Sequence, residues 1–168
     1  MADSAPEKSE SMAQRGRAVL KSENFLDFID LLEQHQVRYL LIGGYAVNLH
    51  GHIRNTKDID FWFDRTPENC ERLEQVTRDF GVLAFDAEEL LEPGMVFQTG
   101  FAPERIDLLN GAGPDFSAVY ERAEQIPIPG TRAGVKLISK PDLIELKKLA
   151  GRLQDLSDIE RLGGGGQR

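Results

Sequence analysis

The chain has 168 residues, a formal net charge of −8 at pH 7 and a pI near 4.9. This length suits one domain with a substantial core, and the acidity argues against a protein that binds nucleic acid by neutralising many phosphates. A single cysteine, Cys70, excludes an internal disulfide framework, and its place on an apolar helical stripe predicts burial. The N-terminus lacks the apolar segment of a signal peptide, and no apolar run approaches the roughly 18 residues of a membrane span. We therefore expect a cytoplasmic protein without membrane contact.

The first third of the chain predicts a tail, a helix and a buried strand. Residues 1–21 carry almost no large apolar side chain, so we expect a mobile tail there. An amphipathic helix with Ser22 as N-cap should follow and cover one face of a sheet, because its apolar positions recur with helical spacing: Phe25, Phe28, Ile29 and Leu32. The largely apolar run 37–42 predicts the first strand of that sheet.

Two motifs follow this strand. Gly43 and Gly44 end it before a short helix expected over 45–50, and glycines let the backbone N–H groups at a helix start approach a ligand closely. Asp58 and Asp60 belong to a second strand, Asp58-Ile59-Asp60-Phe61, whose period of two places both carboxylates on one face. Two neighbouring carboxylates repel each other unless a cation lies between them, and oxygen ligands of this kind suit Mg²⁺. The stretch therefore predicts a phosphate-binding turn followed by a metal site.

The rest of the chain predicts further alternating elements. Thr66 and Pro67 are typical of a helix start, and this helix should end at Phe80-Gly81. Phe61-Trp62-Phe63 favours a strand packed on both faces. The remaining elements are expected in this order: a short strand at 82–85, a hairpin of strands 95–101 and 105–109, a helix at 115–124, an edge hairpin of 126–129 and 135–138, helices from 139 to 153 and from 155 to 162, and a flexible Gly-rich tail at 163–168.

Asp107 is unusual because it lies between apolar neighbours inside a predicted strand. A buried carboxylate needs a partner, either a cation or hydrogen-bond donors. The residues alone leave two interpretations open. Asp107 takes part in the cation site, or it is a strand-end aspartate bonded to a neighbouring backbone N–H.

Ile42-Gly43-Gly44 and Asp58-Ile59-Asp60-Phe61 resemble the signature of the nucleotidyltransferase superfamily, in which Gly-Gly or Gly-Ser precedes Asp-apolar-Asp-apolar by a spacer. Gly51 and the arrangement Arg54-x-Thr56-x-Asp58 resemble the small bacterial nucleotidyltransferases and the AbiEii-like abortive-infection toxins. The resemblance implies an α/β (α+β) nucleotidyltransferase fold with a small mixed sheet and helices packed mainly on one side. It implies a single domain over 22–162. Tyr45 departs from the serine that many relatives carry after the glycines.

The resemblance also implies a site. Asp107 would complete a catalytic metal site with Asp58 and Asp60, binding Mg²⁺ or, as the alternative, Mn²⁺. Lys147 and Arg152 resemble the basic residues of a C-terminal Lys-x4-Arg-x2-Asp-x2-Asp pattern and would reach the nucleotide phosphates, with Asp155 and Asp158 orienting Arg152. The predicted phosphate-binding residues are Gly43, Gly44, Arg54, Thr56, Lys147 and Arg152. Ordinary ion pairs on a helix surface remain the alternative for the C-terminal set, and a surface loop for Arg54 and Thr56.

The implied activity is transfer of a nucleotidyl group from an NTP to an acceptor hydroxyl, with Mg²⁺ bound and pyrophosphate released. The acceptor stays open among a small molecule, an RNA and a protein. Two alternatives also stay open: a toxin of a toxin–antitoxin pair, with an antitoxin-like protein partner, and a non-catalytic nucleotide-binding protein of the same fold. A structural module with a degenerate site fits less well, because the three aspartates are present.

Overall fold

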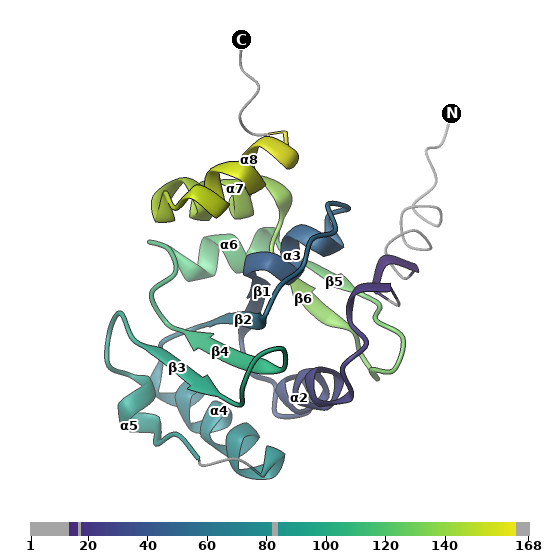
Figure 1. Ribbon diagram of the computed structural model, residues 1–168. Coiled ribbons are helices and arrows are strands. Elements are labelled where there is room, and N and C mark those ends of the chain that lie inside the picture. The colour runs from purple at the N-terminus through teal and green to yellow at the C-terminus, as the bar shows by residue number, and fades with distance from the viewer. Residues whose placement is uncertain (1–13, 17, 82–83, 164–168) are drawn as a thin grey trace.

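The computed structural model describes residues 14–16, 18–81 and 84–163. In these residues six strands form one mixed sheet in the order β3-β4-β2-β1-β6-β5 (Figure 1). β2 runs parallel to β4 and β1 parallel to β6, whereas the other neighbours are antiparallel. The strands are β1 (Tyr39–Ile42), β2 (Asp58–Phe63), β3 (Val96–Thr99), β4 (Arg105–Leu109), β5 (Glu124–Ile126) and β6 (Val135–Leu137). The predicted α+β class with a small mixed sheet is confirmed.

Helices are interspersed between the strands, and side chains cap several of them. Ser22, Thr66, Asp115 and Ser139 each accept a hydrogen bond from a backbone N–H three residues later. The caps predicted at Ser22 and Thr66 are thus confirmed. The helices are α2 (Glu23–Gln34), α3 (Gly43–Leu49), α4 (Pro67–Phe80), α5 (Ala87–Leu90), α6 (Phe116–Arg122), α7 (Lys140–Ala150) and α8 (Leu153–Arg161).

The two faces of the sheet have different roles. On one face Phe61 of β2 packs against Phe28 of α2 at a ring-centroid distance of 5.6 Å, and Phe28 contacts Phe80 of α4 at 5.2 Å. These two helices form the main core with the sheet. On the other face Trp62 packs edge-on against Phe116 of α6 at 5.2 Å. The expected packing of the Phe61-Trp62-Phe63 strand on both faces is confirmed, since all three side chains are buried.

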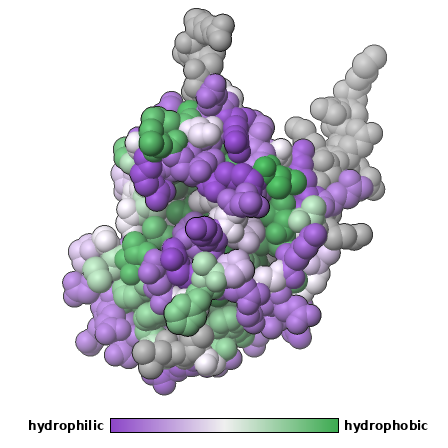
Figure 2. All heavy atoms as spheres, in the orientation of Figure 1, coloured by the Kyte–Doolittle hydropathy of each residue, from purple (hydrophilic) through white to green (hydrophobic). Residues whose placement is uncertain are grey.

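The helical hairpin of α7 and α8 lies on the side of the sheet away from α2 and α4 (Figure 1). It carries exposed apolar side chains, which give the hydrophobic patch over these helices in Figure 2: Leu149, Leu153 and Leu156. Cys70 is fully buried, as predicted. Among the described residues, no helix combines the length and the apolar character needed to cross a bilayer.

Some element boundaries differ from the prediction. β1 begins at Tyr39, because the N–H of Val37 still bonds to the carbonyl of Leu32 and completes the end of α2. α3 begins at Gly43 itself, since this glycine adopts φ +71° and turns the chain directly from strand into helix. β5 ends at Ile126, before the two prolines that were placed inside the predicted strand 126–129; proline has no N–H for a ladder.

Other predictions concern the weakly patterned segments. Residues 84 and 85 do not form the strand predicted at 82–85, and 82–83 lie outside the described residues. α5 has no counterpart in the prediction. In the segment expected as an N-terminal tail, residues 14–16 and 18–19 are helical and Leu20 is buried, while 1–13 and 17 lie outside the described part. Of the expected C-terminal tail, Gly163 is described.

Candidate active site

Three carboxylates meet on one face of the sheet. Asp58 and Asp60 alternate along β2, and the parallel register of β2 with β4 pairs Asp60 with Asp107. Oxygen atoms of these three side chains all lie within 4.8 Å of one another. The strand periodicity explains the arrangement, because Ile59 and Phe61 point to the opposite, buried face. The structure therefore brings together the three residues predicted for the metal site.

Asp60 is the member of this cluster whose ionisation is most affected. Burial, followed by the negative charges of Asp58 and Asp107, raises the pKa of Asp60 to about 7. The positive charges of Lys147 and Arg152 act in the opposite direction. Among the described residues, no hydrogen-bond donor reaches the Asp60 carboxylate. The cluster thus has an excess of negative charge that a bound cation would relieve.

Arg105 lies within the same cluster, and the sequence analysis missed it. It stands opposite Asp58 in the β2–β4 register, and its guanidinium donates to Oδ1 of Asp107 at 3.0 Å and to Oδ2 at 3.2 Å. A further bond goes to Oδ2 of Asp58. Asp107 also accepts a long bond of 3.5 Å from Gln98 on β3. The partners of Asp107 are therefore side chains, and the alternative of a backbone N–H partner is wrong.

The glycine turn between β1 and α3 lies against the carboxylates. A Cβ atom on Gly43 would collide with Oδ2 of Asp60. A Cβ atom on Gly44 would come within 2.6 Å of Oγ1 of Thr56 and 3.1 Å of Nη2 of Arg54. Ile42 at the N-cap provides no side-chain acceptor for the first N–H groups of α3. The backbone of Gly43 and Gly44 therefore lies so close to the site that a side chain at either position would displace the neighbouring side chains.

Arg54 and Thr56 lie in the loop between α3 and β2, and hydrogen bonds fix this loop. Asn48 accepts from the backbone N–H of Arg54 and donates to its carbonyl, both at 2.9 Å. The hydroxyl of Thr56 donates to the carbonyl of Asp58 at 3.1 Å. The Arg54 guanidinium is bidentate to Asp158 of α8, at 2.9 and 3.1 Å. The two side chains thus connect the loop with the carboxylate strand and with α8.

The C-terminal motif forms a buried ion-pair network. Lys147 is 5 % exposed, and its Nζ lies 3.1 Å from Asp155 and 3.0 Å from Asp158. Arg152 bonds to Asp155 through Nε at 2.7 Å, yet its side chain is 76 % exposed. Asp155 orients Arg152 as expected. The same expectation for Asp158 is wrong, because its partners are Lys147, Arg54 and Gln154.

Hydrogen bonding sets the ionisation of the two buried aspartates in this network. Burial alone would raise the pKa of Asp158, but hydrogen bonds from Arg54 and Lys147 hold that pKa below its ordinary value. Asp155 behaves in the same way with Arg152 and Lys147 as donors. Both carboxylates are therefore charged at neutral pH, and the network contains two anions and three cations. Two of these cations, Lys147 and Arg152, also act on the pKa of Asp60 in the acidic cluster.

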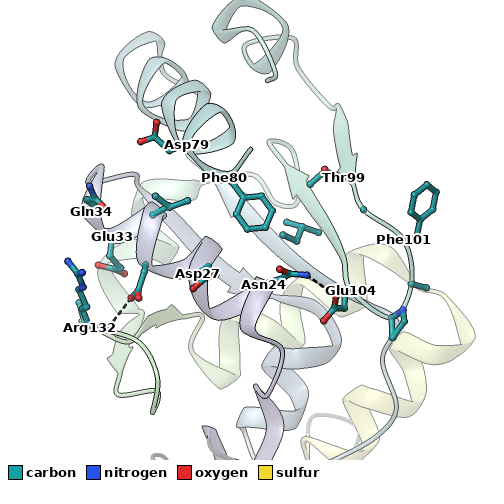
Figure 3. A pocket seen from close by; sticks show the side chains of 17 residues that line it. Asn24, Asp27, Glu33, Gln34, Asp79, Phe80, Thr99, Phe101, Glu104 and Arg132 are labelled. Carbon is teal, nitrogen blue, oxygen red and sulfur yellow. Dashed lines mark hydrogen bonds between the residues drawn. The ribbon is translucent and has the colours of Figure 1, made fainter. Parts of the chain in front are cut away.

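A separate cavity of about 1200 Å³ lies between α2, the end of α4 and the loop from Thr99 to Glu104 (Figure 3). Several of its acidic side chains already have partners: Glu104 accepts from Ser22 and Asn24, and Asp30 accepts from the backbone N–H of Arg132. None of the three clustered aspartates lines it. We therefore place the chemistry at the cluster and not in this larger space.

A glycine turn after a buried strand, beside three carboxylates on two neighbouring parallel strands, is the arrangement expected of a nucleotidyltransferase. The family described as "Nucleotidyltransferase of unknown function (DUF6036)" matches residues 23–163. The chain belongs to this family, and it is a member of the nucleotidyltransferase superfamily. No protein with a curated description matches the chain. The narrower likeness to AbiEii-like toxins stays a prediction.

Proposed function

We propose that the protein transfers a nucleotidyl group from an NTP to an acceptor hydroxyl, using a divalent metal ion held by Asp58, Asp60 and Asp107. The observation that supports this most strongly is the position of the three carboxylates, within 4.8 Å of one another and against the turn at Gly43. Hard oxygen donors suit Mg²⁺, or Mn²⁺ in its place. The pKa of Asp60, raised by burial and then by the negative charges of Asp58 and Asp107, agrees with this position.

The residues around the cluster have distinct proposed roles. When bound, the metal would neutralise charge on the triphosphate and polarise the reacting oxygens. Gly43 and Gly44 would let the phosphates approach the uncapped N–H groups of α3. Arg152, whose side chain is largely exposed, would contact phosphate directly. Arg54, Thr56 and Lys147 would support phosphate binding by fixing the loop and by their positive charge.

The proposed reaction is an in-line displacement at the α-phosphorus. The acceptor oxygen forms a bond to this phosphorus while the bond to the bridging oxygen of the β-phosphate breaks, and pyrophosphate leaves. Asp107 takes up the proton of the acceptor hydroxyl. The field of Lys147 and Arg152, which favours the ionised form of Asp60, would also favour the negative charge that develops on pyrophosphate.

The first test is thermal unfolding with each of ATP, GTP, CTP and UTP, with and without Mg²⁺. A nucleotide at about 100 times its Kd adds roughly 2.7 kcal/mol, which for a chain of this size raises Tm by about 5 to 10 °C. We expect a Mg²⁺-dependent rise that Asp60→Asn loses, and pyrophosphate release that this variant also loses. Asp79→Asn is the matched control, since it removes the same charge at a site that pairs with His35. Undiminished turnover in Asp60→Asn would rule the proposal out.

A further inference from the structure

Arg105 is a cation built into the place where a metal ion would bind. Its side chain is one-third exposed, and it comes from the β4 position opposite Asp58. The guanidinium contacts both oxygens of Asp107 and Oδ2 of Asp58. Two of the three carboxylates that we assign to the metal therefore already share one positive charge from a residue of the chain itself.

A guanidinium and a divalent ion cannot both bind these carboxylates with their full affinity. Arg105 already bonds to both oxygens of Asp107, so a metal ion bound there shares an acceptor with it, and at a separation of a few ångströms two positive charges repel strongly in a partly buried site. Entry of the metal must therefore draw Arg105 away from at least one aspartate. The guanidinium then needs another anion, because its fork geometry suits bidentate acceptors such as carboxylate and phosphate.

We propose that Arg105 is an internal counter-cation that competes with the metal ion for Asp58 and Asp107 and passes to a phosphate group of the nucleotide when metal and nucleotide bind together. This inference rests on the proposed function. The Arg105 guanidinium stabilises the carboxylate cluster without metal and keeps the affinity of the cluster for metal alone low. The full affinity for metal appears once an anionic substrate provides the displaced guanidinium with a new partner.

A purely structural role for Arg105 makes a different prediction. If the guanidinium served only to hold β2 and β4 together, its removal would loosen the carboxylates and weaken the binding of metal and nucleotide alike. In the competition mechanism the two affinities change in opposite directions. Removal of Arg105 strengthens the binding of metal alone and weakens the binding of nucleotide at saturating metal.

The experiment measures two affinities in the full-length protein. The first is Mn²⁺ binding without nucleotide, followed by the electron paramagnetic resonance of free Mn²⁺. The second is binding of a non-hydrolysable α,β-methylene NTP at saturating Mg²⁺, by calorimetry, with the base taken from the thermal screen. The variants are Arg105→Gln, Arg105→Lys and Asp60→Asn. Arg122→Gln is the matched control, because Arg122 is also bidentate to one aspartate, Asp142, outside the cluster.

We expect Arg105→Gln to bind Mn²⁺ about tenfold more tightly than the wild type and the NTP analogue about tenfold more weakly. Arg122→Gln should change neither affinity. If a folded Arg105→Gln variant bound Mn²⁺ with unchanged or weaker affinity, the proposed role of Arg105 would be wrong. The metal-site proposal would still hold in that case if the wild type bound Mn²⁺ and Asp60→Asn did not. Absence of Mn²⁺ binding in both the wild type and Arg105→Gln would overturn the role of Arg105, whereas absence of Mg²⁺-dependent binding of the NTP analogue to the wild type would overturn the proposed function itself.

Arg105→Lys decides the question if Arg105→Gln does not fold. It keeps a positive charge between the aspartates but loses the fork that binds two phosphate oxygens. We expect this variant to retain the wild-type fold and to bind the NTP analogue severalfold more weakly at saturating Mg²⁺. Affinity equal to the wild type would show that the guanidinium does not reach phosphate.

Discussion

The three aspartates of the acidic cluster differ in how the negative charge of each is compensated. Asp58 and Asp107 have a guanidinium partner, whereas Asp60 has burial and two negative neighbours, which together raise its pKa. The difference follows from the register, because Arg105 stands opposite Asp58 and Asp60 stands opposite Asp107. Asp60 is also the carboxylate that touches the glycine turn. It is therefore the residue at which the proposed metal site and the proposed phosphate site meet.

Gly43 allows a direct test of that junction. Gly43→Ala introduces two costs: a backbone at φ +71° that an L-residue rarely adopts, and a methyl group that collides with Asp60. Gly94→Ala is a matched control, since Gly94 has φ +72° but nothing within 4 Å of the added Cβ. We expect both variants to lose about 1 to 2 kcal/mol through backbone strain. Gly43→Ala alone should lose the Mg²⁺-dependent rise in Tm with nucleotide.

The comparison of the two glycine variants separates strain from geometry. Urea unfolding without ligand gives the cost of backbone strain in Gly94→Ala and the cost of strain plus collision in Gly43→Ala, while the Tm shift with Mg²⁺ and nucleotide measures the effect on the site. If Gly43→Ala kept the full ligand-dependent shift, the turn would not form part of the nucleotide site, whatever its stability.

At the scale of elements, the ion-pair network connects parts of the chain that are distant in sequence. Arg54 comes from the loop after α3, Lys147 from α7 and Asp158 from α8, and all three meet in a buried position. Contacts of this network hold the helical hairpin over the loop that leads into β2. Because Arg152 starts α8, the same contacts determine where its exposed guanidinium lies relative to the carboxylates.

Asp158→Asn should therefore destabilise the fold strongly. The fully buried Asp158 is shared by Arg54 and Lys147, and its loss as an anion leaves Asp155 to compensate the buried ammonium. We expect a loss of about 3 to 5 kcal/mol in the free energy of unfolding, measured by urea denaturation. Glu145→Gln on the same hairpin breaks an exposed pair with Lys148 and should cost at most about 0.5 kcal/mol. Equal losses in the two variants would show that the network does not support the hairpin.

The elements also show what sequence reasoning can and cannot reach. The two-residue period of Asp58-Ile59-Asp60-Phe61 correctly placed both carboxylates on one face, because it reports burial of the intervening residues. The same period at Arg105-Ile106-Asp107 puts Arg105 beside Asp107, a signal that was present and not used. By contrast, the pairing of Arg54 with Asp158 spans 104 residues, and no local pattern encodes which distant carboxylate a guanidinium selects. The start of α5 likewise depends on a bond to a residue of another element, from the N–H of Ala87 to Glu74 of α4, whereas the start of β1 depends on the local bond from Val37 to Leu32.

At the scale of the whole molecule, the distribution of charge gives the metal-free protein a defined pH dependence. The pKa of Asp60 is about 7 in the folded state and near 4 in an unfolded chain. The folded state therefore holds a proton that the unfolded state releases between these values. The stability associated with this proton is fully present below about pH 4 and is lost as the pH rises to about 7.

The opposite holds for carboxylates with hydrogen-bonded charge partners. Hydrogen bonding from Arg122 outweighs burial and lowers the pKa of Asp142, and the bonds described above lower those of Asp155 and Asp158. Their contribution is present above about pH 4 and is lost as the pH falls further. The chain has a pI near 4.9, so above this pH its net negative charge grows and repulsion between its charges lowers stability, as the ionisation of Asp60 does. These two contributions should make stability without metal decline from pH 5 to pH 8, against a smaller opposing contribution from His50, whose pKa burial lowers.

Asp60→Asn tests the assignment of that decline. In chelator, we expect the Tm of the wild type to fall from pH 5 to pH 8, with most of the fall below about pH 7, and the Tm of Asp60→Asn to fall less. Asp27→Asn, which removes the same charge at an exposed position of α2, should keep the wild-type slope. Saturating Mg²⁺ should reduce the slope of the wild type, because a bound cation stabilises the ionised Asp60 that high pH produces. Parallel pH profiles for the wild type and Asp60→Asn would mean that global repulsion, and not the acidic cluster, sets the pH dependence.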